Sequence, residues 1–332
     1  MSDTTASAAP PRRRLNLHVL GPVLALVALI VLGASLNANF LGYGNVTNVL
    51  ARSAFIGIIA VGMTFVITAG GIDLSVGSMA AFVAGVMIMA MNAMIPTLGV
   101  GVPLILAGMC VALLAGLAAG LLNGFLISKV GIEAFIVTLG SMGIYRSLVT
   151  WLADGGTLSL DFAARGFYRP VYYDGLLGVS WPIIVFAIVA VLGELTMRHT
   201  PFGRHCAALG ANEQVAKYSA VKVDRVRMGT YVLLGMLVGL ATIMYVPRLG
   251  SASGSTGTLW ELEAIAAVII GGTVLKGGFG RVWGTVVGVL ILSLIDNILN
   301  LASIVSPYLN GAIQGVIVIL AVVLQREGKS AD

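Results

Sequence analysis

The chain is dominated by long apolar runs that contain no charged residue. One such run, "AFIGIIAVGMTFVITA", occupies residues 54–69, and another, "MAAFVAGVMIMAM", follows at residues 79–91. Apolar runs of about 17 to 25 residues match the length that an α-helix needs to cross ~30 Å of hydrocarbon. A membrane-spanning β-barrel would alternate apolar and polar residues instead. The sequence therefore predicts an all-α polytopic membrane protein.

Composition supports this class, since 58% of the residues are hydrophobic and only 10% are charged, against about 25% charged in a soluble domain. We expect a single transmembrane domain over residues 18–325 with about ten transmembrane helices. The eighth expected span is short and contains Gly-Gly, so either a complete or a broken helix fits it. The expected spans are 18–36, 54–70, 75–94, 103–128, 134–152, 181–197, 229–247, 262–275, 282–300 and 309–325.

The positions of lysine and arginine predict how the chain is oriented. With these spans, 14 of the 19 basic residues lie on the same side as the N-terminus, and basic residues accumulate on the cytoplasmic side of membrane proteins. We therefore expect a disordered cytoplasmic tail at 1–17, a cytoplasmic tail at 326–332, a cytoplasmic loop at 198–228 and a periplasmic loop at 153–180. The net charge of +5 then reflects topology, and no nucleic-acid partner is expected.

The sequence contains no motif for chemistry of its own. The phosphate-binding pattern G-x-x-x-x-G-K-[ST] is absent, and none of the three histidines has a partner at metal-ligand spacing. The two cysteines, Cys110 and Cys206, lie in an expected span and in a cytoplasmic loop, so they are not expected to pair. We predict no catalytic residue, no cofactor and no metal. Energy for transport would come from an ion gradient or from a separate subunit.

The polar stretch "GGIDLSVGS" at residues 70–78 interrupts two apolar runs. Gly70 and Gly71 permit a sharp break between two spans, and Asp73 or Ser75 can cap the helix that follows. Gly77 allows close helix packing. This structural interpretation explains the residues, and a direct role in gating is the alternative.

A few other polar residues are expected at membrane depth, where they are costly. They either form hydrogen bonds between helices or line a pathway for a neutral solute. These candidates are Asn123, Arg146, Glu261, Glu263, Asn297 and Asn300. For Arg146 we expect a partner, either one of the two glutamates or carbonyl groups at a helix end.

The loop at 198–228 is long and basic. Asn212 is a plausible N-cap, and "EQVAKYSAV" after it predicts a short helix. Such a helix can lie on lipid headgroups or bind a groove on a soluble partner. A solvated basic loop is the third interpretation.

Three blocks of the sequence resemble a known family. They are "AFIGIIAVGMTFVITAGGIDLSVGSMAAF", "TPFGRHCAALGANEQVAKYSAVKVDRVR" and "LWELEAIAAVIIGGTVLKGGFGRVWGTVVGVLI". In this order and spacing they resemble the membrane permease subunit of bacterial ABC importers for ribose and related sugars. The resemblance extends at lower density from about residue 35 to 325.

This resemblance implies a multi-pass permease of the bacterial inner membrane that is surrounded by membrane lipid and forms a sugar pathway with a second permease copy or a paralogue. It also implies a cytoplasmic ATP-binding subunit and a periplasmic sugar-binding protein. The family's coupling helix, which docks on the ATPase, maps onto residues 203–222. Gly210, Asn212 and Ser219 stand at matching positions, and Gly203, Ala216 and Lys217 complete the expected ATPase-coupling residues. Ala211, Ala220 and Lys222 depart from the commoner pattern.

The residues alone leave two other functions open. A gradient-driven secondary carrier for a neutral small solute would usually carry ionisable groups deep in its spans, and most acidic residues here lie in loops or at span ends. A membrane scaffold that transports nothing is the other alternative. The sequence does not choose the sugar, nor between a homodimer and a heterodimer.

Overall fold

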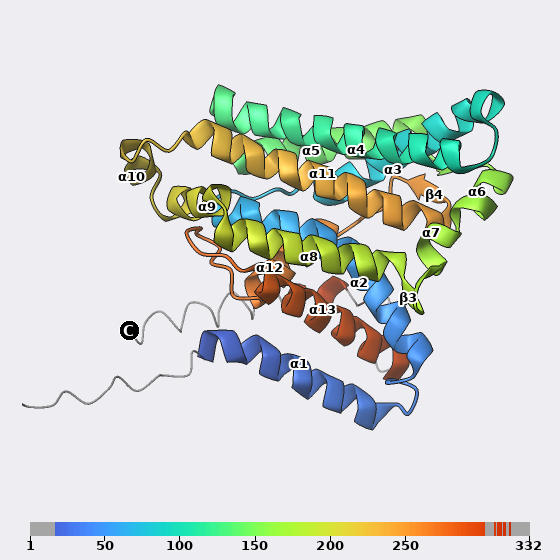
Figure 1. The fold of residues 1–332 in the computed structure, drawn as a ribbon, viewed down its shortest axis with the longest axis horizontal. Coiled ribbons are helices and arrows are strands. Elements are labelled where there is room, and N and C mark those ends of the chain that lie inside the picture. The colour runs from blue at the N-terminus through green and yellow to red at the C-terminus, as the bar shows by residue number, and fades with distance from the viewer. Residues whose placement is uncertain (1–16, 303–308, 310, 314, 317–318, 320–332) are drawn as a thin grey trace, which may run out of the picture.

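The computed structural model describes residues 17–302, 309, 311–313, 315–316 and 319. Long helices run roughly side by side in one bundle, with α1 at its edge against α13 (Figure 1). The long helices are α1 (Leu17–Leu36), α2 (Tyr43–Thr68), α3 (Val76–Leu98), α4 (Val102–Phe125), α5 (Ala134–Leu152), α8 (Trp181–His199), α11 (Val223–Leu249) and α13 (Val282–Ala302). Seven of the described helices, all of these but α1, are long and apolar enough to cross a membrane.

Shorter elements gather at the two ends of the bundle (Figure 1). One end carries α9 (Pro201–Ala211) and α10 (Glu213–Tyr218), and we call it the α9–α10 end. The opposite, β-strand end carries α6 (Phe162–Tyr168), α7 (Pro170–Tyr173) and the strands β1 (Thr157–Ser159), β2 (Gly175–Leu176), β3 (Val179–Ser180) and β4 (Ser251–Ser253). β1 pairs antiparallel with β4, and β2 with β3.

The described helices match most of the expected spans, with two differences. α2 begins at Tyr43, eleven residues before the predicted start at 54. The prediction missed its first turns because they contain polar residues, and the spans were predicted from apolar runs. The eighth span is α12 (Trp260–Ile270), whose 11 residues span only about 16 Å, so it is a broken helix. Of the tenth expected span, at 309–325, only seven residues are described, and the tails at 1–17 and 326–332 lie outside the described residues apart from Leu17.

Glycine sets the closest helix packing, between α4 and α11. A Cβ atom at Gly116 would overlap the carbonyl oxygen of Gly235, and one at Gly120 would overlap that of Tyr231. At Gly239 it would lie 2.6 Å from the carbonyl oxygen of Ala112. Small residues four apart let two helix backbones approach closely, which drives helix association where water is excluded. The backbones of α4 and α11 are therefore packed closely against each other.

Two connections turn back into the bundle. Residues 69–75 re-enter from the α9–α10 end, since the carbonyl oxygen of Ile72 accepts a hydrogen bond (3.2 Å) from Tyr231, about two turns inside α11. Residues 254–259 re-enter from the β-strand end, and α12 follows. The two connections meet where a Cβ atom at Gly77 would overlap the carbonyl oxygen of Gly257. Helices α3 and α12 therefore both begin inside the bundle.

Candidate functional site

The predicted short helix in the 198–228 loop is present as α10. The Asn212 side chain accepts a hydrogen bond from the backbone N–H of Val215 (3.1 Å), so Asn212 is the N-cap, as predicted. α9 precedes α10 and is separated from α8 by Thr200 alone. Thr200 is the N-cap of α9, and its hydroxyl accepts a hydrogen bond from the N–H of Gly203 (3.4 Å). A Cβ atom at Gly203 would overlap the backbone of Met197. The corner between α8 and α9 is therefore tight.

The small residues predicted for docking face the chain's own interior. A Cβ atom at Gly210 would overlap the carbonyl oxygen of Thr68 and lie 2.5 Å from the backbone nitrogen of Gly278. The same Gly278 N–H donates to Thr68 (2.9 Å). Ala216 is also buried. The small size of Gly210 and Ala216 is thus already required by packing within the subunit.

The outward face of α10 is formed by other residues. Tyr218 is 88% exposed and Val215 58% exposed, although both side chains are large and partly or wholly apolar. Lys217 and Ser219 are exposed beside them. The sequence analysis did not select Val215 or Tyr218, although their spacing of three residues indicated a shared helix face.

Glu213 is the charged centre of this segment. Its carboxylate lies 2.7 Å from the amine of Lys217 and 2.6 Å from the guanidinium of Arg227. The hydrogen bond from Lys217 is the main cause that lowers the pKa of Glu213 below its ordinary value of 4.5. Partial burial acts in the opposite direction, and Arg227 lowers the pKa further. These contacts tie α10 to the start of α11.

Asp73 is buried in a cluster of neutral hydrogen-bond donors. One carboxylate oxygen accepts from the backbone N–H (2.8 Å) and the hydroxyl (2.6 Å) of Ser75, and the other from the side-chain amide of Asn123 (3.3 Å). The Asn123 carbonyl oxygen accepts from the hydroxyl of Ser141 (2.6 Å). These four residues, here named the Asp73 cluster, join the start of α3 to α4 and α5. Of the two predicted caps on α3, Asp73 accepts the N–H of Ser75, the N-cap residue, whereas the Ser75 hydroxyl donates to Asp73 and caps nothing.

The glycines of the same motif each serve a close approach. Gly70 has a left-handed backbone (φ +82°) and lies against Gly210. Gly71 leaves room for the Tyr231 hydroxyl, which would be 2.6 Å from a Cβ atom there. Gly77 makes the contact between the two re-entrant connections.

The remaining pathway candidates do not form one site. On α5, Arg146 donates to the carbonyl oxygens of Gly254 (2.7 Å) and Thr256 (2.5 Å), which belong to the connection before α12 and not to a helix end. The side-chain amides of Asn297 and Asn45 exchange two hydrogen bonds (2.9 and 3.0 Å) between α13 and α2.

Glu263 lies in the first turn of α12 with Glu261. Asn300 donates to the carbonyl oxygen of Asp296 on its own helix (2.8 Å).

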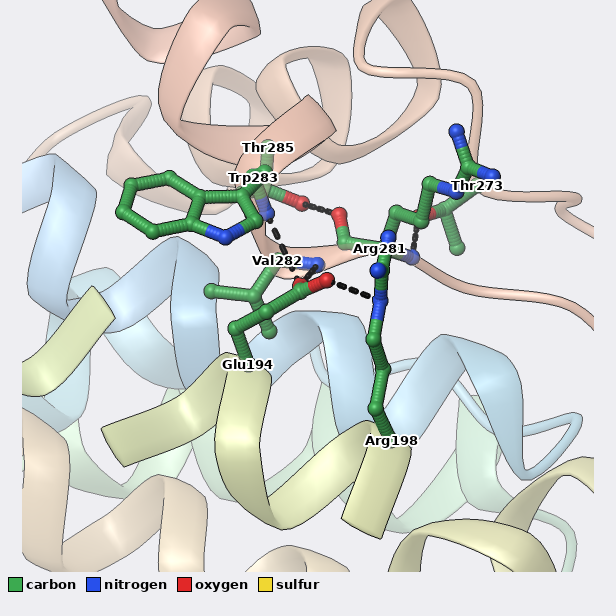
Figure 2. A network of polar contacts seen from close by, with 7 residues as sticks. All are labelled: Glu194, Arg198, Thr273, Arg281, Val282, Trp283 and Thr285. Carbon is green, nitrogen blue, oxygen red and sulfur yellow. Dashed lines mark hydrogen bonds and ion pairs between the residues drawn. The ribbon is translucent and has the colours of Figure 1, made fainter. Parts of the chain in front are cut away.

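A polar network that the sequence analysis did not select surrounds Glu194 of α8 (Figure 2). One oxygen of its carboxylate accepts hydrogen bonds from the backbone N–H groups of Val282 (2.9 Å) and Trp283 (3.1 Å). The other oxygen forms an ion pair with Arg198. A single acidic residue in an apolar run, four residues before an arginine, was the available sequence signal.

Among the described residues, no group of three or more histidine, cysteine, aspartate or glutamate side chains could hold a metal ion. Cys110 is exposed on α4 and Cys206 is buried in α9, and both are free thiols. Burial raises the pKa of the Cys206 thiol to about 12, so that thiol is unreactive. The polar residues described above position helices against one another.

Comparisons with known proteins place most of the chain in one family. The family model described as "Branched-chain amino acid transport system / permease component" matches residues 45–322. The ribose import permease protein RbsC of Bacillus subtilis (strain 168) is 39% identical, over 94% of each chain. The fructose import permease protein FruG of Bifidobacterium longum (strain NCC 2705) is 32% identical, over 94% of this chain and 92% of the relative. The xylose transport system permease protein XylH of Escherichia coli (strain K12) is 30% identical, over 93% and 92%. The chain is therefore a multi-pass membrane protein that belongs to the family of permease components of branched-chain amino acid transport systems.

Proposed function

We propose that this chain is the permease subunit of an ATP-driven importer for a monosaccharide in the inner membrane. The observation that carries this proposal is its identity of 30–39%, over more than nine-tenths of its length, to permeases named for ribose, fructose and xylose import. A periplasmic sugar-binding protein would deliver the sugar, and a separate cytoplasmic subunit would hydrolyse ATP. No observation favours a secondary carrier or a scaffold.

The test is uptake by the reconstituted complex of permease, ATPase and binding protein in proteoliposomes. Labelled D-ribose, D-fructose and D-xylose form the panel, and we expect ATP-dependent accumulation of at least one of them. Uptake should stop when ATP is removed while the proton gradient is held constant. Uptake that follows the proton gradient without ATP would contradict the proposal, and so would no uptake of any sugar by the assembled complex.

We place the ATPase contact on α10, within the predicted 203–222 segment. Its exposed Val215 and Tyr218 offer a soluble partner apolar area on an otherwise basic end of the bundle. In this arrangement Gly203, Gly210 and Ala216 fix the segment to the subunit, while Asn212 caps its helix. Lys217 and Ser219 flank the contact.

Co-purification tests this contact. Tyr218→Ala and Val215→Asp should release the ATPase from a permease that still assembles in the membrane. Tyr173→Ala is the matched control, since Tyr173 is 52% exposed at the β-strand end. If the α10 variants kept the ATPase bound, the turn at 276–281, with its exposed Phe279, would be the next candidate.

We place the second permease subunit and the sugar pathway against the outward face of α5. Nothing lies within 4 Å of a Cβ atom at Gly140 or Gly143. Farther along the helix, Arg146, Ser147 and Thr150 line a hollow of about 460 Å³. Lipid tails cannot form hydrogen bonds with the polar side chains that line this hollow. Water or protein must therefore lie against these side chains. Asn123 lies inside the Asp73 cluster and is not on this face.

Cysteine labelling tests the α5 face. Ser147→Cys is introduced together with Cys110→Ala and Cys206→Ala, and the product is treated with a membrane-impermeant maleimide. A pathway position should react, and delivery of sugar or ATP should change the rate. A position that faces lipid would not react with this reagent under any of these conditions.

A further inference from the structure

Glu194 is a buried carboxylate outside both the proposed docking face and the proposed pathway face. Its residue is 5% exposed, and it lies one turn before the end of α8, the helix that leads into α9. Burying a charge has an unfavourable desolvation free energy, which specific partners must offset. Figure 2 shows these partners around the first residues of α13.

The carboxylate holds the beginning of α13. The N–H groups of Val282 and Trp283 belong to its first turn, where an α-helix has no acceptors of its own and carries a partial positive charge. Both donate to one oxygen of Glu194 (2.9 and 3.1 Å). The cap of α13 is thus supplied by the side chain of a different helix, at a separation of 88 residues.

The other hydrogen bonds of this network do not reach α8. The hydroxyls of Thr285 and Thr64 are hydrogen-bonded (2.7 Å), which joins α13 to α2. The backbone N–H of Arg281 donates to the hydroxyl of Thr273 (3.3 Å), within the connection from α12. Glu194 therefore supplies the polar link between α8 and α13 in this network (Figure 2).

The end of α8 that carries Glu194 leads directly into the α9–α10 segment. Thr200 is the single residue between α8 and α9, and the corner is tight because a Cβ atom at Gly203 would overlap the backbone of Met197. A displacement of α9 is therefore transmitted along α8. It must either carry α13 with it or break two hydrogen bonds to an ionised acceptor, which are stronger than neutral ones.

We propose that Glu194 is a positioning residue that transmits movement of the α9–α10 segment to α13, and so links ATP hydrolysis to rearrangement of the membrane helices. This inference rests on the proposed role of α10 as the ATPase contact. Arg198, which is half exposed, balances the charge of the carboxylate from the α9–α10 end.

The experiment compares Glu194→Leu with Glu194→Gln in the reconstituted complex. Leucine and glutamine have similar volume, but only glutamine keeps an oxygen that can accept from Val282 and Trp283. Sugar uptake, using a sugar that the wild-type complex accumulates from the ribose, fructose and xylose panel, and binding-protein-stimulated ATP hydrolysis are measured on the same vesicles. We expect Glu194→Leu to lower uptake per ATP hydrolysed about tenfold, and Glu194→Gln to recover most of it.

Asp224→Asn is the matched control, because it removes a carboxylate at the same end of the bundle, from an exposed pair with Lys129. Its uptake per ATP should equal that of the wild type. If Glu194→Leu and Glu194→Gln gave the same ratio, or lowered uptake and hydrolysis in parallel, Glu194 would be only a structural cap and the inference would be overturned. The α10 contact is tested separately, by co-purification of the ATPase with the Tyr218→Ala variant. Retention of the ATPase there would overturn the proposed contact, and with it the route through α9.

Discussion

Asp73 and Glu194 are both carboxylates buried toward the α9–α10 end, yet their surroundings differ. Asp73 is 1% exposed and accepts from the neutral groups of Ser75 and Asn123. Glu194 is 5% exposed and accepts from the start of a helix, while a half-exposed arginine balances its charge. A membrane-buried acid can thus be stabilised by a closed neutral cluster or by a helix terminus with a cation.

The two arrangements suit different tasks. The Asp73 cluster joins three elements through side chains that have no path to water, so disturbing one member leaves the others unsatisfied. Glu194 joins two helices, and Arg198 connects it to the surface. We infer that the Asp73 cluster fixes a unit that moves as one body, and that Glu194 lies between bodies.

The largest expected effect is that of Asp73→Ala. It leaves the N–H and the hydroxyl of Ser75 without their acceptor, while the Asn123 amide keeps only the Ser75 hydroxyl (3.1 Å). Each orphaned buried group costs about 1–3 kcal/mol. We expect a much larger fall in the thermal midpoint of the detergent-solubilised protein than for Glu194→Ala, where Arg198 can turn to water. Asp174→Ala, at an exposed position, is the control. Equal losses at Asp73 and Glu194 would remove the distinction between the two environments.

Sequence reasoning found Asp73 but not its environment. The residue was visible as a charge between two apolar runs, and the short length of the eighth span correctly indicated a possible broken helix. Asn123 was selected as a pathway residue, because nothing in a sequence shows that its amide meets a carboxylate 50 residues away. Glu194 was missed although Arg198 follows four residues later, since its contacts with α13 are made to backbone N–H groups, which leave no signature in the side-chain pattern. Gly210 was assigned to docking although its small size serves contacts with Thr68 and Gly278.

The second prediction concerns one glycine near each acid, Gly77 four residues after Asp73 and Gly193 directly before Glu194. A methyl group on Gly77 would meet the Gly257 carbonyl, which is backbone, whereas on Gly193 it would lie 2.7 Å from a methyl of Val61, which can rotate. Overpacking costs about 1–3 kcal/mol, and we expect Gly77→Ala at the upper part of this range and Gly193→Ala below it. Thermal midpoints of the two variants decide this. The reverse order would show that the meeting of the re-entrant connections is looser than the Glu194 link.

A smaller effect is expected at the edge of the Asp73 cluster. Ser141→Ala removes one hydrogen bond (2.6 Å) to Asn123 and leaves Asp73 with all of its donors, so the loss should be about 1 kcal/mol. Thr150→Ala, at an exposed position on the same helix, controls for the helix itself. A loss as large as that of Asp73→Ala would mean that the cluster depends on α5 more than on its carboxylate.

Arg198→Gln tests how much the cation contributes to the Glu194 environment. The guanidinium is half exposed, and ion pairs in contact with water contribute about 0.2–1 kcal/mol. We expect Arg198→Gln to be slightly less stable than the wild type. In 1 M salt this difference should nearly vanish, because the Debye length is then ~3 Å and the ion pair of the wild type is screened. A loss comparable with that of Glu194→Ala, and insensitive to salt, would show that the ion pair and not the helix cap stabilises the buried acid.

Glu213 gives the exposed reference for both buried acids, and the smallest expected effect. Its pKa is held below 4.5, first by the hydrogen bond from Lys217. A carboxylate whose pKa is lowered by folding contributes stability above its ordinary pKa, and this contribution is lost as the pH falls through the lowered value. The thermal midpoints of wild type and Glu213→Gln should therefore differ by the same small amount between pH 6 and 8, worth about 0.2–1 kcal/mol. They should converge in acid, at a pH below 4.5. Convergence already near pH 6 would mean that burial, which raises the pKa of Glu213, outweighs its two cationic partners.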